Sequence, residues 1–210
     1  VICLIYVDDA LFVYKSPEEV DILTKKMKDL GMLFEEESDV AGYLGVLIDR
    51  DPENDTITLR QSGLAQRIVE ALHLDDDTPS ITTPASAFLP QDVDGENAHE
   101  IYNYASVAGM MQYLQGHSRP DISFAVSQVS RYTFGPKRSH ELAIERIGRY
   151  LKGTIDKGLI LKPNLKETTF KIDVYVDAAF ASGWGTELGS NPDSVKSRTG
   201  YIVEVMGCSV

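Results

Sequence analysis

Two short apolar runs at the start of the chain, with only three residues between them, constrain the fold most. Residues 1–6 (VICLIY) and 10–14 (ALFVY) are rich in β-branched and aromatic side chains, which favour strands. The connecting Val7-Asp8-Asp9 is too short for anything except a tight reversal. We therefore expect a β-hairpin with two buried strands and two adjacent carboxylates at its tip.

The pattern that follows predicts an α+β chain. Ser16 and Pro17 have the chemistry of a helix start, and the apolar stripe of that helix ends at Gly31. Further strands are expected at 43–48 and 56–59, which makes residues 1–60 a β-α-β-β segment. Helices are expected from Ser62 to 72, from 102 to 114, from Pro120 and over 136–151, and period-two alternation predicts strands at 170–177 and 200–206. The connection over 75–100 is long enough that we expect it to be either functional or mobile.

Composition excludes several classes of protein. The longest apolar run, residues 1–7, has seven residues, whereas a membrane helix needs about 20, so we expect no membrane partner. Two cysteines at opposite ends, with no zinc-ligand spacing, suit a reducing, intracellular compartment. Twenty basic and 32 acidic residues give a net charge of −12, so any contact with nucleic acid must be local. Because Val1 opens inside a strand-like run, we expect this chain to be a fragment of a longer polypeptide.

Asp8 and Asp9 are the strongest candidates for chemistry. Two carboxylates at a rigid tip could hold Mg²⁺, which prefers oxygen ligands and keeps positions for water and substrate phosphates. The alternative is structural, because aspartate is common in turns, where its side chain bonds to the backbone.

Several motifs together resemble one family. Tyr6-Val7-Asp8-Asp9 between apolar strands resembles the palm motif of reverse transcriptases. Other segments resemble copia-type retrotransposon polymerases in the expected order: 42–48 (GYLGVLI), 61–68 (QSGLAQRI), 109–114 (GMMQYL), 118–126 (SRPDISFAV), 149–154 (RYLKGT), 175–181 (YVDAAFA) and 197–202 (SRTGYI). The strength of the match lies in the ordered set.

The resemblance implies a division into three parts. Residues 1–60 would be the C-terminal part of a polymerase palm, made of a hairpin, a helix and a primer-grip-like hairpin. Residues 61–155 would be a helical thumb and connection that includes the 75–100 loop, and residues 156–210 would hold the first strands of an RNase H-like sheet.

The resemblance also implies roles for individual residues. Asp8 would ligate metal with Asp9 as its supporting neighbour, and Tyr6 and Val7 would lie beside the primer end and the incoming nucleotide. Two-metal catalysis needs carboxylates from more than one strand, and the family places another aspartate on an earlier strand, which would precede Val1.

Asp177, by the same resemblance, would be the first RNase H metal ligand, at the end of a central strand. Its other ligands would follow Val210. The alternative is structural, because an aspartate at the end of a strand usually faces solvent and has no catalytic role. Leu44 and Gly45 would belong to the primer grip, where glycine allows a nucleic-acid strand to approach the backbone. The plain interpretation of that pair is a packed hairpin residue followed by a bulge.

Basic residues are concentrated between Arg131 and Lys157, a segment that contains seven lysines and arginines but only three acidic residues. Arg146, Arg149 and Lys152 recur at three-residue spacing, so one helix face could follow a phosphate backbone. Alternatively, these three side chains simply face solvent on a surface helix.

The resemblance implies an RNA-directed DNA polymerase with RNase H activity that uses two Mg²⁺ ions, a primer-template and dNTPs. It also implies a location in cytoplasmic virus-like particles. We expect this fragment to be inactive without the missing palm and RNase H segments. Two alternatives remain: a catalytically dead or domesticated remnant that acts as a nucleic-acid-binding or interaction module, and an unrelated acidic α+β domain. A 43–48 hairpin far from Asp8 would support the unrelated domain.

Overall fold

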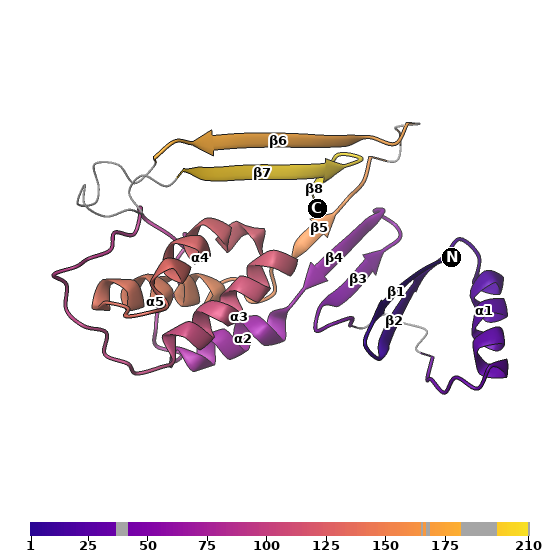
Figure 1. The fold of residues 1–210 in the computed structure, drawn as a ribbon, viewed down its shortest axis with the longest axis horizontal. Coiled ribbons are helices and arrows are strands. Elements are labelled where there is room, and N and C mark those ends of the chain that lie inside the picture. The colour runs from indigo at the N-terminus through magenta and orange to yellow at the C-terminus, as the bar shows by residue number, and fades with distance from the viewer. Residues whose placement is uncertain (37–41, 165, 167–168, 182–196, 210) are drawn as a thin grey trace. The chain divides into compact units, whose positions relative to one another are not determined.

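The computed structural model describes residues 1–36, 42–164, 166, 169–181 and 197–209 (Figure 1). The chain contains helices and antiparallel sheets, as an α+β chain should. It divides into two compact units, Val1–Ile48 and Asp49–Val210. Among the described residues, no helix is both long enough and apolar enough to span a membrane.

The first unit contains the predicted hairpin and helix. Strands β1 (Ile2–Tyr6) and β2 (Asp9–Val13) pair antiparallel, and α1 (Pro17–Asp29) follows. Ser16 is the N-cap residue of α1, as a helix start at Ser16 and Pro17 predicts, but its hydroxyl donates to the Glu18 carboxylate and not to the backbone of the helix. The expectation that both strands are buried is wrong for the described structure, because the sheet has only two strands and β1 is exposed along its length.

A three-stranded sheet contains β3 (Leu47–Asp51), β4 (Thr56–Arg60) and β5 (Leu159–Leu161) (Figure 1). The turn between β3 and β4 forms as its residues predict, since the Asp51 carboxylate accepts hydrogen bonds from the backbone N–H groups of Glu53 and Asn54. Strand β5 pairs antiparallel with β4 and was not expected from the sequence.

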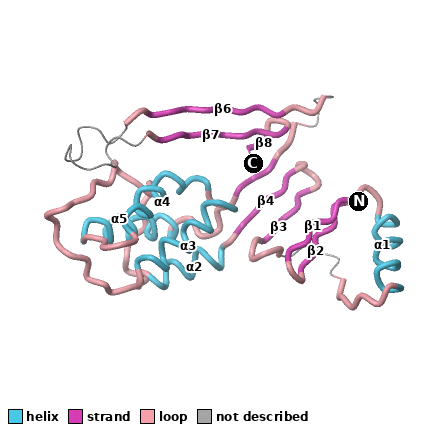
Figure 2. Tube along the Cα trace, in the orientation of Figure 1, coloured by secondary structure: helices cyan, strands magenta, loops and turns pink. Residues whose placement is uncertain are grey.

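Four helices build the main core: α2 (Ser62–Ala71), α3 (Tyr104–His117), α4 (Ser123–Val129) and α5 (Arg138–Lys152), with single 3₁₀ turns at η1 (Pro120–Ile122) and η2 (Ser130–Tyr132). Figure 2 shows these helices as one group. Helix α2 packs against α3 and α5, and α4 packs against the same two helices. The side chains at the centre are almost completely buried: Ile68, Met111, Leu114, Ile122, Ile144, Ile147 and Leu151. Burial of such side chains supplies most of the stability of a domain of this kind.

Several polar side chains are buried within this helical group, among them Gln61 and Arg119. Gln61 is the N-cap of α2, and its side-chain oxygen accepts a hydrogen bond from the Ser118 hydroxyl at 2.9 Å. Arg119 is 1% exposed; it pairs with the Asp121 carboxylate at 2.9 Å and donates to the carbonyl oxygen of Thr154 at 2.8 Å. A buried arginine is tolerable because each of these donors has an acceptor.

The last sheet contains β6 (Ile172–Ala179), β7 (Arg198–Val205) and β8 (Cys208–Ser209), all antiparallel. The period-two alternation over residues 170–177 therefore predicted a strand correctly. In the described sheet β7 is central and β6 lies at an edge.

Candidate functional site

The turn between β1 and β2 presents the Tyr6-Val7-Asp8-Asp9 motif. Tyr6 and Asp9 form the last pair of the ladder, so Val7 and Asp8 are the two central residues of the turn. Val7 has φ 54, a left-handed conformation that a β-branched residue rarely adopts and that costs about 1–3 kcal/mol. Hairpin turns of two residues favour positive φ because it matches the twist of the strands. Strand pairing thus forces the strained geometry at Val7.

All four motif residues are exposed; Val7 is 85% exposed and Tyr6 is 59% exposed. Asp8 lies in the turn and Asp9 begins β2, so the two carboxylates are neighbours on a short, fixed connection. Their oxygens are the ligands that Mg²⁺ prefers. Within the described residues, however, no group of three or more His, Cys, Asp or Glu side chains could hold a metal ion. A role of the tip in metal binding stays a prediction.

The primer-grip-like segment forms a second tight turn. Tyr43 and Val46 exchange backbone hydrogen bonds of 2.9 and 3.0 Å across Leu44 and Gly45. Both central residues have positive φ, 54 for Leu44 and 74 for Gly45, a combination typical of a type I′ turn. The interpretation of Gly45 as a bulge is therefore wrong, because it is a central turn residue. The turn also explains why β3 starts at Leu47 and not at residue 43 as predicted.

Glycine at position 45 is required by conformation and not by crowding. A side chain added there would meet nothing within 4 Å among the described residues. The turn is held near the first hairpin, because the Tyr43 hydroxyl donates to the carbonyl oxygen of Leu4 at 3.4 Å. The segment thus lies beside β1, the strand that leads to Asp8.

Asp177 lies inside β6, opposite Gly200 on β7. The strand continues for two residues beyond Asp177, through Ala178 and Ala179, so the position is near the end of β6 and not at it. A central position of β6 in a larger sheet stays a prediction. The carboxylate is exposed. A role as a metal ligand stays a prediction.

The three basic residues predicted to follow a phosphate backbone lie on α5, and their donors bind the connection over residues 75–100. Lys152 donates to the carbonyl oxygens of Asp75, Asp76 and Thr78. Arg149 donates to the carbonyl oxygen of Pro79 and Arg146 to the hydroxyl of Thr83, both at 2.8 Å. In this structure the three residues therefore hold the 75–100 connection against α5. Their contact with nucleic acid stays a prediction.

The rest of the 75–100 connection is also fixed. Tyr132 donates to the carbonyl oxygen of Leu89 at 3.0 Å, and His140 bonds to the carbonyl oxygen of Pro90 at 2.9 Å. Further along, the buried Glu141 carboxylate accepts the backbone N–H groups of His99 and Glu100 at 2.9 and 3.0 Å. The loop thus packs as part of the helical group.

His140 and Glu141 were not identified as important residues from the sequence. His140 is 1% exposed and stacks on the Tyr132 ring with centroids 3.8 Å apart. Burial lowers the pKa of His140, although the Pro90 carbonyl opposes the shift. The hydrogen bonds of the Glu141 carboxylate outweigh its burial and keep its pKa low. A clue for Glu141 was available, because Arg138 precedes it by three positions on a helix.

Comparison with known proteins gives three informative similarities. The chain is 29% identical over 202 residues to the retrovirus-related Pol polyprotein from transposon RE2 of Arabidopsis thaliana, which covers 95% of this chain and 13% of that protein. It is 28% identical over 222 residues to the corresponding polyprotein from transposon TNT 1-94 of Nicotiana tabacum. This match covers 100% of this chain and 15% of that protein. An uncharacterized mitochondrial protein of Arabidopsis thaliana is 29% identical over 99% of this chain and 79% of its own length.

No family model matches the chain. No solved structure matches it either. The chain spans only 13–15% of the transposon polyproteins named above. The similarities nevertheless extend over nearly all of its residues. This chain is therefore related, over nearly its full length, to the Pol polyproteins of copia-type retrotransposons.

Proposed function

We propose that the chain is part of an RNA-directed DNA polymerase with RNase H activity, and that Asp8 and Asp9 form part of its nucleotidyl-transfer site. The observation that carries the proposal is the exposed Tyr6-Val7-Asp8-Asp9 turn in a chain related to transposon Pol polyproteins. Fixed neighbouring carboxylates at a hairpin tip suit a metal that must also contact a substrate.

In this proposal Mg²⁺ would activate the primer 3′-hydroxyl and neutralise the charge of the triphosphate. Asp8 would ligate the metal and Asp9 would support it. Tyr6 and Val7 would contact the primer end and the dNTP, and Leu44 and Gly45 would guide the primer strand. Further carboxylates would come from residues outside this chain, because two carboxylates alone do not complete a two-metal site.

Asp177 would serve a second metal site, for cleavage of RNA in the RNA–DNA hybrid. The primer-template and the missing palm and RNase H segments would be the partners, and virus-like particles in the cytoplasm would be the location. The isolated 210 residues would extend no primer, because the proposed metal site needs further carboxylates.

The test uses a longer Pol polypeptide that includes this segment, assayed for primer extension with Mg²⁺. Asp8→Asn should abolish nucleotide addition and leave primer-template binding within about twofold of the parent. Asp55→Asn is the matched control, because Asp55 also lies in an exposed hairpin turn, between β3 and β4. Equal loss of binding and addition in Asp8→Asn would assign Asp8 a structural role.

A second arm separates the two proposed sites. Asp177→Asn should abolish cleavage of RNA in a hybrid while primer extension continues, because the two reactions would use different metals. Unchanged RNA cleavage in that variant would exclude Asp177 from the second site.

A second candidate function is a catalytically inactive binding or interaction module. Its supporting observation is that Arg146, Arg149 and Lys152 bind the chain itself, which leaves an acidic protein with fewer free cations for phosphates. Primer extension by the longer polypeptide, lost in Asp8→Asn, would exclude this candidate.

A further inference from the structure

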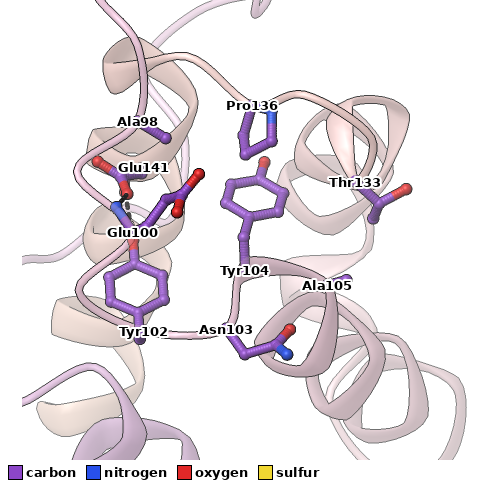
Figure 3. A pocket seen from close by; sticks show the side chains of 9 residues that line it. All are labelled: Ala98, Glu100, Tyr102, Asn103, Tyr104, Ala105, Thr133, Pro136 and Glu141. Atoms are coloured by element: carbon purple, nitrogen blue, oxygen red, sulfur yellow. Dashed lines mark hydrogen bonds between the residues drawn. The ribbon is translucent and has the colours of Figure 1, made fainter.

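A cavity of about 410 Å³ opens where the end of the 75–100 connection meets α3 and α5. Figure 3 shows the side chains that line it. Its walls include Glu100, Tyr102, Tyr104 and Pro136, with Glu141 next to Glu100. This volume lies within the range of small-ligand sites, at about 300–1,000 Å³. It belongs to the helical group and not to the hairpin that carries Asp8.

The charge around the cavity is negative. The Glu141 carboxylate is covered and accepts hydrogen bonds from two backbone N–H groups and from the Arg138 guanidinium at 3.0 Å. Arg138 also pairs with Glu145 at 2.8 Å, so one cation neutralises only one of two carboxylates. Glu100 adds another carboxylate, which is exposed and forms no ion pair among the described residues.

Glu100 is held in an unfavourable conformation. Its φ is 55, in the left-handed region that glutamate rarely adopts, and its backbone N–H is fixed by the Glu141 carboxylate at 3.0 Å. Strain of this kind persists where the surroundings fix the backbone, and it clusters at binding sites. In Figure 3 the Glu100 side chain points into the space beside Tyr104.

Tyr102 is partly buried and offers ring surface, whereas Tyr104 is only 6% exposed; the hydroxyl groups of both tyrosines are already used. The Tyr102 hydroxyl donates to the carbonyl oxygen of Glu141 at 3.2 Å, and the Tyr104 hydroxyl donates to that of Val129 at 2.8 Å. Burial raises the pKa of Tyr102, and Glu145 and Glu141 raise it further, so its ring stays neutral. A neutral aromatic ring attracts cations through its face.

Aromatic rings beside an unpaired carboxylate favour a cation and repel a phosphate or a carboxylate. The one nearby feature that attracts anions, the N-terminus of α3, is partly satisfied because Asn103 accepts the N–H of Ser106 at 2.9 Å. We propose that this cavity binds a guanidinium or ammonium group, either on an arginine or lysine side chain of a peptide or on a small free cation. The inference does not rest on the polymerase function.

The experiment follows backbone amide signals of the full chain by NMR during titration with blocked arginine amide. The expected result is a saturable shift of amides in 98–105 and at Thr133, with a dissociation constant near 1 mM, about what a ligand of this size can reach. Blocked citrulline amide has the same shape without the charge and should cause no saturable shift. Equal shifts with arginine and citrulline would overturn the proposal.

Two variants test the residues that carry the site. Glu100→Gln should weaken binding about fivefold, and Tyr102→Leu should weaken it as well. Asp94→Asn is the matched control, since Asp94 is an exposed acid of the same loop that does not line the cavity, and its affinity should be unchanged. Equal weakening by Asp94→Asn and Glu100→Gln would show general attraction to acidic loops and would overturn the site. Spectra of each variant outside residues 98–105 report whether it remains folded.

A last arm identifies the source of the cation. Titration with a Gly-Arg-Gly peptide and with spermidine compares a peptide side chain with a free polyamine. Tighter binding of the peptide assigns the cavity to a protein partner, and tighter binding of spermidine assigns it to a small cation. Absence of saturable binding by all the cationic probes would overturn the proposal.

Discussion

The hydroxyl of Tyr43 donates a hydrogen bond to the carbonyl oxygen of Leu4, 39 positions earlier, at 3.4 Å. Leu4 and Tyr6 lie on the same face of β1, because strand side chains alternate. The contact therefore connects the Leu44–Gly45 turn to the strand that ends at the Asp8 turn. The structure therefore does not show the wide separation of this turn from β1 that would have supported an unrelated α+β domain.

Tyr43→Phe removes this hydrogen bond. Because the contact is long and exposed, we expect a loss of at most about 1 kcal/mol in the free energy of unfolding. Faster hydrogen exchange is expected at the amides of Tyr43 and Val46, which close the turn. Tyr14→Phe is the control, since the Tyr14 hydroxyl makes no hydrogen bond in the described part of the chain, and it should leave both amides unchanged. Unchanged exchange in Tyr43→Phe would show that the contact does not hold the turn.

Lys152→Met tests whether the basic face of α5 serves the fold or nucleic acid. The change removes the hydrogen bonds of Lys152 to three carbonyl oxygens of the 75–100 connection, of which that of Asp75 keeps the N–H of Thr78, so we expect a loss of about 1 kcal/mol in the free energy of unfolding, measured by urea denaturation. Faster proteolysis between 75 and 83 should accompany it. Lys162→Met, at an exposed position after β5, should stay within about 0.5 kcal/mol. Unchanged stability with weaker binding of single-stranded DNA would assign Lys152 to phosphate contact.

The parts of the fold that could be predicted from sequence are those fixed by nearby residues. The Asp8 and Asp55 turns, the start of α1 at Pro17 and the alternation of β6 depend on local chemistry. Strand β5 could not be predicted, because its three residues become a strand only by pairing with β4 about 100 positions earlier.

The candidate site shows the same division. The exposed carboxylates at the hairpin tip follow from the sequence of the turn itself. The partners of Arg146, Arg149 and Lys152 lie 63 to 77 positions earlier in the chain. The three-residue spacing along the helix therefore could not distinguish a face that binds phosphate from one that binds a loop of the same chain. Burial of Glu141 beneath the same loop was hidden for the same reason.

Gly148→Ala tests the close approach of α2 and α5. An added Cβ would collide with the side chain of Leu72 and lie 2.9 Å from that of Leu74, so we expect a loss of about 1–3 kcal/mol in the free energy of unfolding. Gly109→Ala on α3 is the matched control. Nothing lies within 4 Å of its added Cβ, so the better helix propensity of alanine should stabilise the protein by about 0.5–1 kcal/mol. Equal effects of the two changes would exclude tight packing at Gly148.

His140 should make stability depend on pH. The backbone N–H of Lys137 donates to Nδ1 at 2.9 Å, so the ring proton lies on Nε2 and donates to the Pro90 carbonyl. Protonation of Nδ1 would remove the acceptor of Lys137 and place a charge in a buried position. Of the charged groups near the ring, Asp92 favours that charge, whereas Arg131 and Lys137 oppose it.

Because burial lowers the pKa of His140 in the folded state, the unfolded state binds the proton more readily. The stabilisation is complete above the unfolded pKa of about 6.5 and is lost as pH falls from there through the folded pKa. We expect the free energy of unfolding, from urea titrations between pH 7.5 and 5, to fall by at most about 1.4 kcal/mol per pH unit from this group. His140→Gln should flatten that slope, whereas His73→Gln, at an exposed position, should retain it. The same slope in the parent and in His140→Gln would show that another group controls the response. Stability depends on pH only through groups that bind a proton differently in the folded and unfolded states.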